Sequence, residues 1–94
     1  MTLEEAAEHC ERAFAAYAAR EGVKRDEPFY LLKLQEEMGE LARHFLELGS
    51  QPSAEQRREF QGDCASIVGN ALILAKHHGV DLAQRLKEKF PAPK

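Results

Sequence analysis

The sequence predicts an all-α protein, a four-helix antiparallel bundle that is completed by oligomerisation. Four segments repeat apolar residues at helical spacing, short turns separate them, and no segment alternates apolar and polar residues as a strand does. With 94 residues the chain has room for one hydrophobic core, so residues 1–94 are expected to form a single domain. A domain of this size buries a modest share of its surface, which favours self-association.

The first helix is expected at about residues 3–20. Thr2 and Glu5 have the spacing of a capping box at its start, and Gly22 follows its end. Its apolar face carries seven side chains at helical spacing: Leu3, Ala6, Ala7, Cys10, Ala13, Phe14 and Tyr17.

The second helix is expected at about residues 28–48. A charged linker at residues 23–27 precedes it, with Asp26 as a candidate cap and Pro28 in the first turn. Gly49 is expected to end the helix. One face forms an apolar stripe that is expected to be buried: Leu31, Leu34, Met38, Leu41, Phe45 and Leu48.

The third helix is expected at about residues 54–78 and the fourth at about 82–89. Ser53 and Gln56 repeat the capping-box spacing, and Asp81 is the candidate cap of the fourth helix. The third helix has its own apolar stripe: Phe60, Cys64, Ile67, Val68, Ala71, Leu74 and Ala75. The fourth helix is short and carries three apolar residues on one side: Leu82, Leu86 and Phe90.

Composition narrows the class of protein. A net charge of −3 without a basic stripe argues against nucleic acid polymers as partners. No apolar run reaches membrane-spanning length, and the acidic start is unlike a signal or transit peptide, so we expect a cytoplasmic protein without a membrane partner. Cys10 and Cys64 fall on apolar helix faces and are expected to be buried free thiols, with a disulfide between them as the minor alternative.

Carboxylates on the second helix are the first candidates for chemistry. Glu37 and Glu40 lie three residues apart, roughly 70° and 130° from the centre of the apolar stripe, whereas Glu36 points almost directly away from it. Like charges at this spacing repel each other, and a cation or a proton would relieve the repulsion.

The third helix carries a polar line along the edge of its apolar stripe: Asp63, Ser66, Asn70 and His77. If the two helices pack antiparallel, Glu37, Glu40 and Asp63 are expected to converge between them. Oxygen ligands favour Mg²⁺ or Mn²⁺, and Mg²⁺ completes its shell with waters and substrate phosphates. The pattern therefore predicts a metal-assisted reaction on a phosphorylated ligand, and the alternative is an ordinary solvated acidic face.

Two blocks, FYLLKLQEEMGEL at residues 29–41 and LILAKHHGVDL at residues 72–82, resemble the MazG-like nucleotide pyrophosphohydrolases. The resemblance spans roughly residues 14–90. It implies an all-α fold, assembly as dimers or tetramers, and Mg²⁺-dependent cleavage of nucleoside triphosphates to monophosphates and pyrophosphate. It also implies that Glu37 and Glu40 bind the metal and that Glu36 has a secondary role.

The second acidic motif of that family, ExxD, is altered in this chain. An ungapped alignment places the motif on Asp63 and Ser66, so the first charge is kept and the second is lost. A gapped alignment places the family Asp on Asp63 and puts Phe60 at the Glu position. One acid of four is missing either way, which implies weakened turnover or a decayed nucleotide-binding or protein-interaction module. Asn70 lies where relatives often place a side chain near the ligand.

Three further side chains have two interpretations each. Lys33 contacts a substrate phosphate, or it pairs with Glu37 one helical turn later. His77 and His78 lie at a helix C-terminus, where the helix dipole favours a cation, and they are expected to be structural rather than metal ligands.

Overall fold

The computed structural model describes residues 1–26 and 28–94 and is helical, with no strand in these ranges. The helices are α1 (Leu3–Glu21), α2 (Phe29–Glu47), α3 (Ala54–His77) and α4 (Leu82–Lys89). Every expected helix boundary lies within one residue of the observed one, so the all-α prediction is confirmed. Glu27, the last residue of the expected linker, lies outside the described residues.

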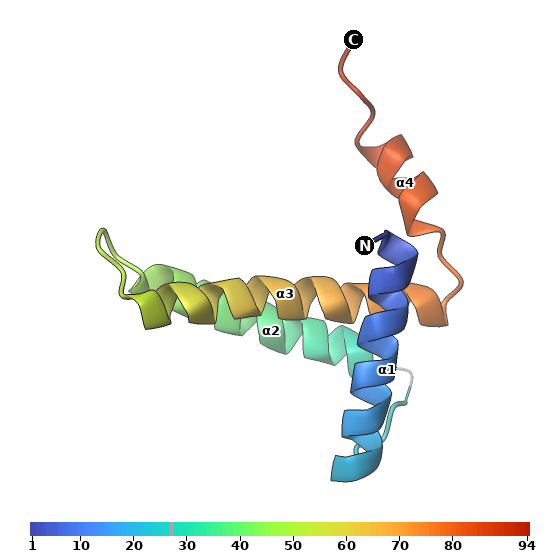
Figure 1. Ribbon diagram of the computed structural model, residues 1–94, viewed down its shortest axis with the longest axis horizontal. Coiled ribbons are helices and arrows are strands. Elements are labelled where there is room, and N and C mark those ends of the chain that lie inside the picture. The colour runs from blue at the N-terminus through green and yellow to red at the C-terminus, as the bar shows by residue number, and fades with distance from the viewer. Residues whose placement is uncertain (27) are drawn as a thin grey trace.

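The helices are arranged around α3 (Figure 1). α2 and α3 lie side by side and antiparallel along the longest dimension of the molecule, which is 49 Å. α1 crosses the C-terminal half of α3, and α4 projects away from the other three helices. The extensive helix contacts are those of α3 with α2 and with α1. None of the described helices has the length and apolar character needed to cross a membrane.

Local capping sets most of the helix ends. Thr2 and Glu5 form a complete capping box, and Ser53 and Gln56 form another. α1 ends at Gly22, whose φ of 66° is a left-handed conformation that glycine adopts without strain. These capping predictions are confirmed.

The expected start of α2 is wrong in its detail. The helix begins after Pro28, which is its N-cap, and no side-chain capping bond is present among the described residues. Asp26 contributes its backbone carbonyl, which accepts a hydrogen bond from the Phe29 amide at 3.1 Å. A proline side chain has no hydrogen-bond acceptor, so Pro28 cannot cap the helix as Ser, Thr, Asp or Asn would.

The apolar core lies where α1, α2 and α3 meet. Its buried apolar residues are Ala18, Tyr30, Leu72 and Ile73. Aromatic rings extend the core along α1 and α2, because Phe14 lies 5.5 Å from Phe29 and 5.7 Å from Tyr30 between ring centroids. Such tilted and edge-on contacts are favourable arrangements for aromatic pairs.

The expected burial of the apolar stripe of α2 is wrong for half of its residues. Three side chains are half-buried: Leu34, Leu41 and Leu48. Three are more than half exposed: Leu31, Met38 and Phe45. Among the described helices, α3 is the one that lies along α2, and a single neighbour covers only part of so wide a stripe. The other edge of the apolar stripe of α2 is therefore exposed to solvent in a single chain.

The apolar stripe of α3 shows the same effect. Val68 is exposed, and so is Cys64. Cys10 is half-buried against Gly69, where a Cβ atom added to the glycine would lie 3.4 Å from the sulfur. Both cysteines are free, as expected, but the expectation that both are buried is wrong. We call the exposed residues Leu31, Met38, Phe45, Cys64 and Val68 the uncovered face.

Candidate functional site

Charged side chains take part in the contact between α2 and α3, which we call the seam. The side chain of Glu37 is 16% exposed and that of Asp63 is 11% exposed. Glu36, next to Glu37, is well exposed and faces away from α3. Because acidic side chains normally remain in water, two carboxylates turned inward in so small a domain need compensation.

Asp63 is compensated by a histidine that sequence analysis did not select. His44 Nδ1 donates a hydrogen bond to Asp63 Oδ2 at 2.5 Å. The other ring nitrogen lies 3.5 Å from a Glu59 carboxylate oxygen and 4.0 Å from one of Glu40. The hydrogen bond with Asp63 raises the pKa of His44 above its ordinary value. The sequence feature that could have identified His44 is its position seven residues after Glu37, which places both side chains on the same face of the helix.

Glu37 and Glu40 are compensated by bases on their own helix. Lys33 Nζ lies 3.7 Å from Glu37 Oε1 and 3.3 Å from Glu36 Oε1. Of the two interpretations of Lys33, the pair with Glu37 is therefore present in this structure. Glu40 is about half exposed, and its carboxylate accepts a hydrogen bond from Arg43 at 3.1 Å.

The three carboxylates do not form a metal site in this arrangement. Within residues 1–26 and 28–94, no group of three or more His, Cys, Asp or Glu side chains is placed to hold an ion. Each carboxylate has a basic partner instead: Lys33, Arg43 and His44. Their oxygen chemistry suits Mg²⁺ or Mn²⁺, but the repulsion that favoured a cation is already relieved by the chain's own bases.

Asn70 is, with Asp63, one of the two buried polar residues of α3. Its Nδ2 donates to the backbone carbonyl of Ser66 at 2.8 Å, one helical turn earlier. Its Oδ1 is buried and has no hydrogen-bond partner among the described residues. Buried acceptors are nearly always paired, so this oxygen is available to a water or to a donor group of a ligand.

A second polar cluster ties the three long helices together near the aromatic rings. One nitrogen of the Arg25 guanidinium donates to both carboxylate oxygens of Glu11, at 2.6 and 2.7 Å. Arg25 Nε donates to the Tyr30 hydroxyl at 2.5 Å. His77 Nε2 lies 3.0 Å from Glu11, in agreement with the structural role expected for it. Burial is the main reason that the pKa of Tyr30 is raised.

No protein-family model, curated protein or solved structure matches this chain. Its function is therefore inferred from the chemistry of its own residues and from the two motif blocks.

Proposed function

We propose that this protein is a MazG-like nucleoside triphosphate pyrophosphohydrolase that uses Mg²⁺ or Mn²⁺ and turns over slowly. The observation that carries the proposal is the inward position of Glu37 and Asp63, which come from two helices and lie in one seam with the half-buried Lys33. The motif blocks supply the reaction class, which is cleavage to a nucleoside monophosphate and pyrophosphate. The proposed site consists of these three residues with Glu40 and Asn70, and Glu36 and Ser66 have secondary roles.

The residues of the seam have distinct proposed roles toward a nucleotide. Lys33 binds the phosphates, because an ammonium group forms strong charge-assisted hydrogen bonds with phosphate oxygens. Asn70 offers its unpartnered buried Oδ1 to a donor group of the ligand. Glu37, Glu40 and Asp63 are the proposed metal ligands. When bound, the metal supplies charge neutralisation and an activated water. Because Lys33 also pairs with Glu37, phosphate binding is expected to release that carboxylate.

Slow turnover follows from Ser66. A hydroxyl stands where the family has a carboxylate, and it cannot act as a general base of comparable strength. Loss of one such interaction lowers a rate by about 10²–10⁴-fold.

We also propose that the uncovered face packs against a second copy, giving a dimer or a tetramer in the cytoplasm. Leu31, Met38 and Phe45 recur every seven residues and are all more than half exposed. Apolar residues grouped in this way on a helix pair are typical of interfaces between copies. The two unpaired cysteines agree with a reducing compartment.

The test is release of pyrophosphate from a panel of nucleoside triphosphates with Mg²⁺ or Mn²⁺. Glu37→Gln is expected to abolish turnover, whereas the exposed neighbour Glu36→Gln serves as the matched control and keeps most of it. Ser66→Asp combined with Asp63→Glu is expected to raise the rate by about 10²-fold or more. If neither the natural chain nor the double variant cleaves any nucleotide, the enzyme assignment fails.

A second candidate function is a non-catalytic helical protein-interaction module, and the ion pairs of the seam favour it. A seam in which each carboxylate already has a base is stable without any ligand. The two candidate functions predict different effects of a nucleotide on the melting temperature. If a non-hydrolysable triphosphate and Mg²⁺ together raise the melting temperature, the chain has a ligand site, and if they cause no shift it is the interaction module.

A further inference from the structure

α4 is an amphipathic helix that touches the rest of the described chain only near its start, where Leu82 is half-buried. None of its residues is buried, and Figure 1 shows it projecting from the body of the molecule. Leu82, Leu86 and Phe90 recur every four residues and lie on one side, and Phe90 is 77% exposed. Because an isolated helix of eight residues is marginal in water, this helix needs a surface to pack on.

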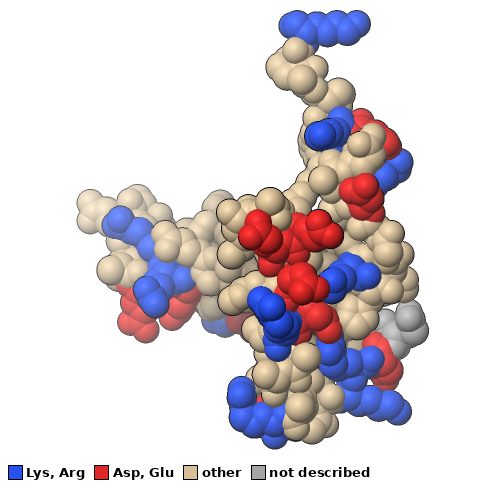
Figure 2. All heavy atoms as spheres, turned by 45° about the vertical axis from the view of Figure 1, so that its right-hand side comes forward, with Lys and Arg blue, Asp and Glu red and all other residues tan. Residues whose placement is uncertain are grey.

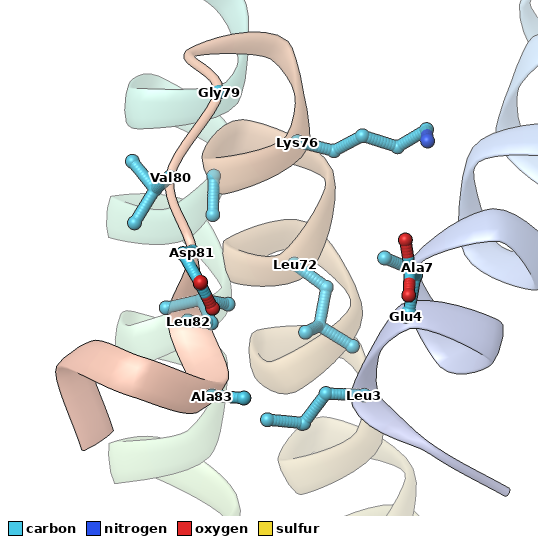
Figure 3. Close-up of a pocket in the computed structure, with 11 residues that line it drawn as sticks. Leu3, Glu4, Ala7, Leu72, Lys76, Gly79, Val80, Asp81, Leu82 and Ala83 are labelled. Atoms are coloured by element: carbon cyan, nitrogen blue, oxygen red, sulfur yellow. The ribbon is translucent and has the colours of Figure 1, made fainter. Parts of the chain in front are cut away.

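A groove lies at the base of this helix (Figure 3). It is a cavity of about 390 Å³ between the start of α1, the end of α3 and the turn that leads into α4. Leu3, Ala7, Leu72 and Val80 give it apolar walls, and Glu4 lies at its edge. Leu3 and Val80 are both exposed, so the groove is open to an apolar side chain from outside.

The α4 of the same chain does not fill this groove. Leu82 and Ala83, at the start of α4, are already part of its wall. At a rise of about 1.5 Å per residue, Leu86 and Phe90 lie about 6 and 12 Å further along a helix that leaves the groove. Leu86 and Phe90 therefore need an apolar binding surface on another molecule.

The charges of the two surfaces are opposite. We call residues 82–94 the arm. The arm carries four basic side chains and one acidic one: Arg85, Lys87, Lys89 and Lys94, and Glu88. The first half of α1, beside the groove, carries Glu4, Glu5 and Glu8, of which Glu8 is paired with Lys76 at 3.0 Å. Figure 2 shows acidic side chains gathered on one face of the body, with basic side chains beside them, and a projecting arm that carries both basic and acidic side chains. Complementary charge of this kind steers association and sets its orientation.

We propose that α4 of one copy packs its Leu86 and Phe90 into the groove between α1 and α3 of a second copy. The exchange is reciprocal, because the same arm and the same groove are present on both copies and a twofold arrangement closes the pair. None of the seam residues takes part, so this contact is independent of the proposed enzymatic function and differs from the uncovered face.

Disulfide trapping between two differently tagged chains tests the contact. Both chains carry Cys10→Ala and Cys64→Ala, one carries Ala7→Cys in the groove, and the other carries Pro91→Cys beside Phe90. After mixing under mild oxidation, most of the protein is expected to form a mixed-tag disulfide. A third chain with Ala16→Cys, on an exposed part of α1 outside the groove, is the control and is expected to cross-link at least tenfold more slowly.

Two results would overturn the proposal. One is a mixed-tag yield no higher than that of the Ala16→Cys control. The other is a chain carrying both Ala7→Cys and Pro91→Cys that closes within itself faster than it links to a partner, because the occupant is then the chain's own arm.

Light scattering gives a second, independent measurement. In a Met38→Asp background, which removes the contact through the uncovered face, Leu86→Ser with Phe90→Ser is expected to weaken association at least tenfold. Gln84→Ser, an uncharged position on the polar side of α4, is the matched control. An unchanged mass for the double variant in this Met38→Asp background would refute the arm contact. Pyrophosphate release by the same variants is expected to survive, so failure of this contact and failure of the proposed function are distinguishable.

Discussion

Replacing Arg25 with alanine is expected to lower the free energy of unfolding by about 2–3 kcal/mol. Arg25 lies in the connection between α1 and α2, and its guanidinium bonds both oxygens of Glu11 on α1 and the Tyr30 hydroxyl on α2. The variant loses all of these contacts at once. It also leaves a partly buried carboxylate without its main cationic partner.

The magnitude follows from the exposure of the two charged side chains. A hydrogen bond to a charged group contributes about 1.5–3 kcal/mol, whereas a fully exposed ion pair contributes about 0–1 kcal/mol. The side chains of Arg25 and Glu11 are 21% and 22% exposed, so their pair lies between these limits. Loss of the bond to Tyr30 adds about 1 kcal/mol. The total is a large fraction of the roughly 5–14 kcal/mol expected for a chain of this length.

Urea unfolding followed by circular dichroism measures the effect. Arg20→Ala is the matched control, because Arg20 pairs with Glu21 at 3.6 Å on an exposed surface, and a change below about 0.5 kcal/mol is expected there. A double-mutant cycle of Arg25→Ala with Glu11→Ala isolates the pair, and a coupling of about 1–2 kcal/mol is expected. Equal effects of Arg25→Ala and Arg20→Ala, or a coupling near zero, would refute the reasoning.

Three further predictions concern the titration of Glu11 and the uncovered face. Burial raises the pKa of Glu11, but its hydrogen bonds, above all that from Arg25, outweigh burial and hold the pKa below its ordinary value. Glu11 therefore contributes stability above pH about 4.3 that is lost as the pH falls through its lower folded pKa. When the free energy of unfolding is measured by urea titration between pH 2 and 7, Glu11→Gln is expected to lose less stability at acid pH than the natural chain. An equal dependence of this free energy on pH in the two proteins would contradict the prediction. Met38→Asp is expected to weaken self-association at least tenfold in sedimentation, whereas Leu46→Asp, exposed on another side of α2, leaves it unchanged. The Cys64 thiol is expected to react quickly with a thiol reagent in dilute protein and slowly at high concentration, and a rate independent of concentration would count against the interface.

The helices and their ends followed from local patterns. The capping boxes at Thr2 and Ser53 involve residues three positions apart, so they form whatever the rest of the chain does. Gly22 ends α1 for a reason confined to its own backbone. Helical periodicity likewise placed Glu37 and Asp63 at the edge of their stripes, and the structure finds both side chains in the seam.

Tertiary structure alone decided which partner each charge has and which apolar edge is covered. His44 and Asp63 are 19 residues apart, and Glu11 and His77 are 66 residues apart. Such pairs depend on how the helices are rotated against one another, which periodicity within one helix does not specify. Leu34 and Met38 belong to the same apolar stripe, on its two different rows, and Leu34 is half-buried whereas Met38 is exposed. The physical reason is that hydrophobic burial has no direction of its own, and the rotation of α2 was settled by the contacts available on α3.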